Sequence, residues 1–92
     1  LESEQYQKQS QLELNKTLRQ LADAENNVAL SAVAFEQARE AYRIRQNRFE
    51  QGLEKTSDVL QSETLMAQKE LEWLQAIFEY QTAQSYLQFL TQ

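Results

Sequence analysis

The 92-residue chain contains no cysteine, no histidine and no proline, and its only glycine is Gly52. The absence of cysteine excludes disulfides and thiolate chemistry. It also means that cysteine usage does not indicate whether the protein resides in an oxidising or a reducing compartment. The absence of histidine removes the commonest general base and metal ligand. Because Gly52 is the only helix breaker, the sequence has one obvious place to turn back on itself.

A basic surface and a long apolar run are also missing. The net charge is −5 and the isoelectric point is about 4.7, so nucleic acid is not an expected partner, because phosphate binding needs a basic face. No apolar run approaches the ~20 residues that span a bilayer, and we expect no signal peptide within these residues. We therefore expect this segment not to insert directly into a membrane. Since the chain begins at Leu1 and not at methionine, we expect it to be cut from a longer polypeptide.

The carboxylates do not form a recognisable catalytic arrangement. The chain lacks histidine and cysteine, and it has no glycine-rich phosphate loop, so no general base or activated nucleophile stands out. We predict that the segment is not an enzyme and has no catalytic residue, no metal site and no cofactor.

What the sequence does contain is a seven-residue repeat of apolar residues. Such a repeat predicts a helix that packs along its length. Leu18 and Ala32 occupy the expected intermediate core position four residues on, where Glu25, Arg39 and Gln46 also fall. Small residues beside the repeat would allow a second helix to approach closely. The repeat is Leu14, Leu21, Val28, Phe35, Tyr42 and Phe49, and the small residues are Ala24, Ser31, Ala38, Ala34 and Ala41.

The pattern stops at Gly52, which predicts a helix C-cap, because glycine enters the left-handed region without strain. Basic residues at 43, 45 and 48 suit the negative end of the preceding helix. Thr56 or Ser57 can act as the N-cap of the next helix, and Asp58 places negative charge in its first turn. The sequence therefore predicts a helical corner.

A second repeat follows the corner. Its main line is Val59, Met66, Trp73, Tyr80 and Leu87, and its flanking lines are Leu60, Ala67, Leu74 and Ala76, Ala83, Leu90. Together these lines make an apolar face that is wider than one partner helix needs.

We therefore predict an all-α fold, a long antiparallel two-helix coiled-coil hairpin that forms a single unit over 1–92. The predicted helices cover about 4–51 and about 57–91, joined by a turn at about 52–56. The short connection makes the helices antiparallel neighbours. This register pairs Phe49 with Val59, Tyr42 with Met66 and Phe35 with Trp73.

The residues around the turn are more specific than a generic coiled coil. They read Arg48-Phe49-Glu50-Gln51-Gly52-Leu53-Glu54-Lys55-Thr56-Ser57-Asp58-Val59-Leu60. This stretch resembles the periplasmic hairpin tip of the TolC-type outer-membrane efflux proteins, and most of all their C-terminal hairpin. The downstream Leu, Ala and Tyr pattern, which includes Leu65, Leu71 and Tyr86, is similar as well.

The resemblance implies a periplasmic segment of a trimeric outer-membrane channel in a Gram-negative bacterium, within a larger α-helical barrel. Its partners would be a periplasmic adaptor (membrane fusion) protein and an inner-membrane pump, and the isolated segment would self-associate. The implied docking residues are Gly52 and Leu53, with Arg48, Phe49 and Lys55 beside them. The implied constriction of the periplasmic entrance involves Asp58 and, nine residues after the glycine, Gln61. Members of the family commonly have an acidic residue at that second position, whereas this chain has Gln61. A double ring of carboxylates is therefore not expected.

Simpler interpretations remain open for each of these residues. Gly52 is a helix C-cap whatever else it does, Asp58 is a helix-start charge, and the arginines fit a solvated face or ion pairs with the second helix or a neighbouring hairpin. Two other classes of protein also remain open. One is the hairpin of the adaptor itself, although its expected tip spacing of Arg, Leu and Ser is not found. The other is a structural coiled-coil scaffold.

Overall fold

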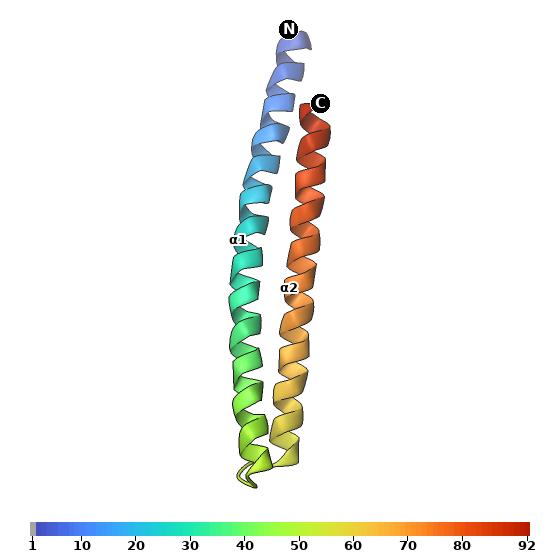
Figure 1. The fold of residues 1–92 in the computed structure, drawn as a ribbon. Coiled ribbons are helices and arrows are strands. Elements are labelled where there is room, and N and C mark those ends of the chain that lie inside the picture. Colours follow the sequence, from blue (N-terminus) through green and yellow to red (C-terminus); the bar gives the residue numbers. More distant parts are fainter. Residues whose placement is uncertain (1) are drawn as a thin grey trace.

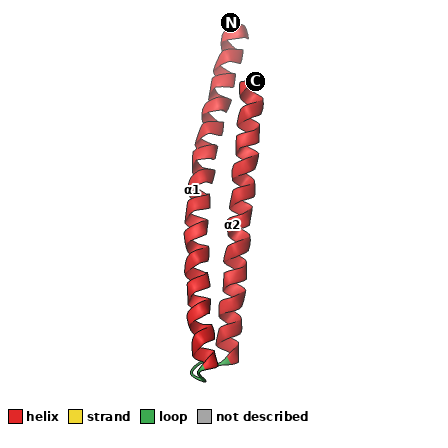
Figure 2. Ribbon diagram, in the orientation of Figure 1, coloured by secondary structure: helices red, strands yellow, loops and turns green. Residues whose placement is uncertain are grey.

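The computed structural model describes residues 2–92, which form two long antiparallel helices joined by a short turn (Figure 1). Helix α1 spans Glu2–Glu50 and helix α2 spans Thr56–Thr91. The described segment is all helix and loop (Figure 2). Its Cα extents are 75 × 16 × 16 Å and its radius of gyration is 21.0 Å. A compact domain of this length would have a radius of gyration of about 12 Å, so the molecule is a rod.

The surface along which the two helices pack is here called the seam. On α1 it is formed by two neighbouring rows of side chains, one of large residues and one of small residues. The large row is the predicted repeat, and its members from Leu14 to Tyr42 are partly buried. The second row lies three residues on from the first, and not four as predicted. In the predicted row Leu18, Glu25 and Arg39 are exposed, while Ala32 and Gln46 are partly buried. The small row is buried or partly buried throughout: Thr17, Ala24, Ser31 and Ala38. The physical cause is simple, because turning the other row toward α2 would remove the charged side chains of Glu25 and Arg39 from water.

The seam on α2 has the same construction. The main line from Val59 to Leu87 is buried or partly buried, as predicted, and so is the flanking line of Ala76, Ala83 and Leu90. Ala76 is the most deeply buried of these, at 2% exposed. The other flanking line, through Leu60, Ala67 and Leu74, is exposed. The apolar surface of α2 is therefore wider than the strip that α1 covers.

The predicted register is confirmed at the pair farthest from the turn. The rings of Phe35 and Trp73 stack with their centroids 5.6 Å apart and their planes 25° apart. Tyr42 and Met66 line one groove beside this stack, together with Phe35. An aromatic stack of this kind adds about 0.5–1.5 kcal/mol beyond its buried area, so a shift in register would lose it.

The seam buries few side chains completely. Within residues 3–92 the buried apolar side chains are Ala38, Val59 and Ala76. Most of the large apolar side chains in the seam keep part of their surface in water, because each helix has one neighbour and not a ring of them. An isolated hairpin of this construction is therefore only marginally stabilised by its own core.

Candidate functional site

The tip of the hairpin is shaped by the way α1 ends. Gly52 has a φ of 76°, which is in the left-handed region that favours glycine. The Leu53 N–H donates to the carbonyl oxygen of Arg48 at 2.8 Å, and the Gly52 N–H donates to that of Phe49 at 2.9 Å. These two bonds are the Schellman motif that closes many helices. The predicted C-cap is therefore confirmed, and it fixes the direction in which the chain leaves α1.

The start of α2 differs from the prediction. The N-cap is Lys55, with extended backbone (φ −80°, ψ 148°) and no side-chain capping bond, so the expectation of Thr56 or Ser57 is wrong. The carbonyl oxygen of Lys55 accepts the N–H groups of Asp58 and Val59, which starts the helix one residue before the hydroxyls could cap it. Asp58 does lie in the first turn of α2, as predicted.

The five residues implied in docking all lie at or beside the tip. Gly52 and Leu53 form its apex, and a side chain built on Gly52 would meet nothing within 4 Å. Leu53 is 61% exposed and Phe49 is 39% exposed, while Arg48 and Lys55 are also exposed. The structure thus brings these residues together as one small surface with an apolar centre.

A residue that the sequence analysis did not single out, Glu54, organises the tip. Its Oε1 lies 3.2 Å from Nη1 of Arg45, and its Oε2 lies 3.9 Å from Nε of Arg48. The Glu54 side chain is only 17% exposed, in a turn where its neighbours are exposed. The signal in the sequence was an acidic residue just beyond the cap glycine, opposite two arginines in the last turns of the preceding helix.

Two other arginines of α1 pair within their own helix. Arg39 contacts Glu36 at 3.4 Å, and Nη2 of Arg43 donates to Glu40 at 2.6 Å. The hydrogen bond from Arg43, together with the Arg43 charge, holds the pKa of Glu40 below its ordinary value. The same hydrogen bond and the Glu40 charge raise the pKa of Arg43. These pairs are exposed and three residues apart, so they support α1 locally and do not link it to α2.

The two residues implied in a constriction lie just beyond the tip. Asp58 is partly buried and Gln61 is exposed. Both line a shallow groove between the helices, whose other lining residues include Ala41, Arg45 and Ser62. Small side chains on both helices open this groove, and Arg45 places a positive charge at the same place as the Asp58 carboxylate.

A second candidate surface is the side of α2 that faces away from α1, here called the α2 outward face. It has no charged residue between Leu60 and Phe89. The acidic residues of α2 (58, 63, 70, 72 and 79) all lie closer to the seam. The α2 outward face comprises Leu60, Thr64, Ala67, Gln68, Leu71, Leu74, Gln75, Phe78, Gln81, Ser85, Gln88 and Phe89, all of them exposed.

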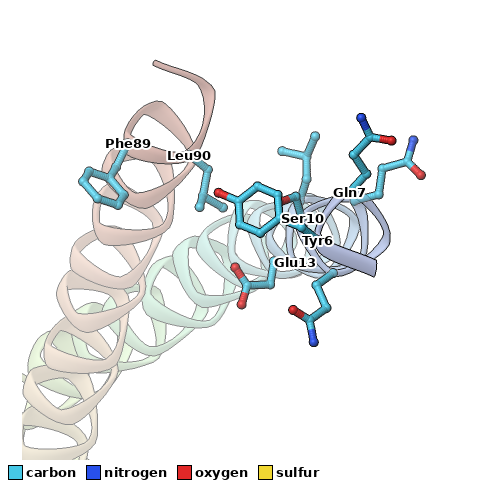
Figure 3. A pocket seen from close by; sticks show the side chains of 9 residues that line it. Tyr6, Gln7, Ser10, Glu13, Phe89 and Leu90 are labelled. Carbon is cyan, nitrogen blue, oxygen red and sulfur yellow. The ribbon is translucent and has the colours of Figure 1, made fainter. Parts of the chain in front are cut away.

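The open end of the hairpin carries a third exposed apolar group. Figure 3 shows Tyr6 of α1 and Leu90 of α2 directed toward the space between the helices, while Phe89 projects from the other side of α2. These residues line an open groove with polar residues of α1 such as Gln7, Ser10 and Glu13. The groove is open to solvent, and Glu13 supplies an acidic side chain to its lining.

In comparisons with known proteins, no family model, no curated protein and no solved structure matches the chain. Within residues 2–92, neither helix is apolar enough over a sufficient length to cross a membrane.

Proposed function

We propose that this hairpin is the periplasmic tunnel segment of a trimeric outer-membrane efflux or secretion channel, whose tip docks onto a periplasmic adaptor protein. The observation that carries the proposal is the tip. A glycine-capped turn presents Gly52 and Leu53 at its apex, inside a sequence that resembles the tips of TolC-type proteins. The turn of the adaptor's own hairpin would pack against this apex.

The α2 outward face supports a place within a larger helical assembly. Leu60, Leu71, Leu74 and Phe78 are each at least half exposed. A contiguous apolar strip of this kind on one helix is typical of a surface that a neighbouring protein covers. In the proposed channel a neighbouring hairpin would cover it, so α2 would pack between two helices.

The proposed docking role of the tip can be tested by placing a charge at its apex in the full-length channel. Leu53→Glu should strongly reduce efflux, because the carboxylate would be buried without a partner when the adaptor docks. Trimer assembly, measured by cross-linking, should be unchanged. Leu12→Glu is the matched control, because Leu12 is similarly exposed (67%) but lies far from the tip. Normal efflux by the Leu53 variant would overturn the docking proposal.

The channel itself is tested by the coding sequence that flanks this hairpin. We expect a signal peptide, segments of about ten residues with alternating hydropathy and a second related hairpin. A parent gene that lacks all three would contradict the proposal.

One other function is favoured by a specific observation. The same exposed apolar side chains would also suit a structural coiled coil that associates only with copies of itself. Such a scaffold would tolerate Leu53→Glu, because its tip has no partner, whereas it would not tolerate a charge on the α2 outward face. The two substitutions together therefore separate the scaffold from the channel.

A further inference from the structure

The turn after Gly52 is held from one side only. Backbone bonds fasten Gly52 and Leu53 to the end of α1, whereas the N-cap of α2 has no side-chain capping bond. The side-chain link that the structure shows for this turn is Glu54, whose two carboxylate oxygens face Arg45 and Arg48 of α1. The conformation of the apex therefore depends on α1 and on this carboxylate.

The position of Glu54 has two consequences for the apex. Its side chain is drawn against α1 (17% exposed), while the preceding residue, Leu53, is left 61% exposed. The carboxylate also offsets positive charge from the two guanidinium groups next to the apex. A partner would then meet an apolar contact at Leu53 and Phe49, and not two unpaired arginines.

We propose that Glu54 is a positioning residue of the tip, which bridges Arg45 and Arg48 and so holds Leu53 outward for an apolar partner surface. This inference rests on the proposed function for the identity of the partner, an adaptor tip, but its structural part does not. In particular, Arg48 acts here by holding the turn, in addition to lying beside the docking surface.

The structural part is tested by hydrogen exchange of the Leu53 amide in this 92-residue chain, without any partner. Glu54→Gln should speed the exchange roughly fivefold, as expected for the loss of a partly exposed ion pair. Glu50→Gln is the matched control, because Glu50 lies as far before Gly52 as Glu54 lies after it, and it should change the rate less than twofold. High salt should bring the wild type toward the Glu54→Gln rate.

Exchanging the charges of Glu54 and Arg45 distinguishes a positioning role of Glu54 from a general loss of stability. Glu54→Arg alone should speed exchange further, and combining it with Arg45→Glu should restore slow exchange. If Glu54→Gln and Glu50→Gln behave alike, or if the reversed pair gives no rescue, the inference is wrong.

The functional part is then tested in the full-length channel. Glu54→Gln should lower efflux, and the reversed pair should recover it. Normal efflux with Glu54→Gln, in a channel that Leu53→Glu inactivates, would overturn positioning and leave docking intact. Normal efflux with Leu53→Glu would instead overturn the proposed function.

Discussion

The two helices of the hairpin present different surfaces on the sides that face away from the seam. The equivalent side of α1, here called the α1 outward face, carries charges of both signs among its apolar residues Leu30, Val33 and Ile44. The charged residues of the α1 outward face are Lys16, Arg19, Asp23, Glu36, Glu40, Arg43 and Glu50, all of them exposed. The α2 outward face consists of glutamine, threonine, serine, alanine, leucine and phenylalanine, and it carries no charged residue.

This difference shows which side of the rod is suited to water. Exposed helices normally place their charges opposite the apolar seam, and α1 follows that rule with local pairs such as Glu40 with Arg43. Helix α2 reverses it, because its acidic residues border the seam and its outward side is uncharged. A helix with an apolar seam on one side and an uncharged face on the other is suited to packing between two neighbouring helices. Its carboxylates would then lie along the edges between these two contact surfaces.

The largest expected effect separates the seam of α2 from its outward face. Trp73→Ala should lower the free energy of unfolding by about 2–3 kcal/mol, because it removes the ring that stacks on Phe35 and leaves a cavity. Phe78→Ala, on the α2 outward face, should change it by less than about 0.5 kcal/mol. Urea unfolding at one fixed low protein concentration measures both. Similar losses for the two variants would mean that Phe78 is part of the hairpin's own core.

A smaller effect of the same kind is expected from two alanines of α2. Ala76 is buried where the helices approach closely, and Ala67 is exposed. Ala76→Leu should destabilise the hairpin by about 1–3 kcal/mol through overpacking, whereas Ala67→Leu should stay within about 0.5 kcal/mol. Thermal unfolding followed by circular dichroism compares the two. An Ala76→Leu variant as stable as Ala67→Leu would show that the seam is loosely packed.

The third prediction compares the two outward faces directly. Leu74→Glu on the α2 outward face should raise the dissociation constant for self-association about tenfold or more, because burying one leucine is worth about 1.5–3 kcal/mol. Leu30→Glu on the α1 outward face should have an effect below about threefold, or about 0.6 kcal/mol. Sedimentation equilibrium measures both. Equal effects, or a wild-type chain that stays monomeric at high concentration, would contradict the role given to the α2 outward face.

The smallest effect concerns the charged side of α1. Because Glu40 accepts hydrogen bonds from Arg43, its pKa lies below the ordinary value of 4.5. The pair therefore favours the folded helix above that pH, and the contribution is lost as the pH falls through the lowered pKa. Arg43→Gln should move the Glu40 pKa back toward 4.5. Arg39→Gln should move it less, because Arg39 acts on Glu40 through its charge alone and makes no hydrogen bond to it. A carboxyl-carbon NMR titration measures these values, and an unchanged Glu40 in the Arg43 variant would contradict the assignment.

Much of the fold was predictable because it depends on local chemistry. A single glycine in a chain without proline determines where α1 ends, and the apolar repeats determine which large side chains face the partner helix. The short connection makes the helices antiparallel, and the repeat then pairs Phe35 with Trp73. The exposed position of Leu53 at the apex follows from the same turn.

Other features were decided only when the two helices packed together. Heptad spacing allows either neighbouring row of α1 to complete the seam, and the choice of the small row through Ala38 depends on how closely α2 approaches. The N-cap moved to Lys55 because the path out of the Schellman turn, and not hydroxyl chemistry at Thr56, determines where α2 begins. The bridge from Glu54 to Arg45 joins residues on opposite sides of the turn. The sequence alone determined the helices and their order, and tertiary packing decided which sides meet, because contacts between helices depend on their rotation and separation.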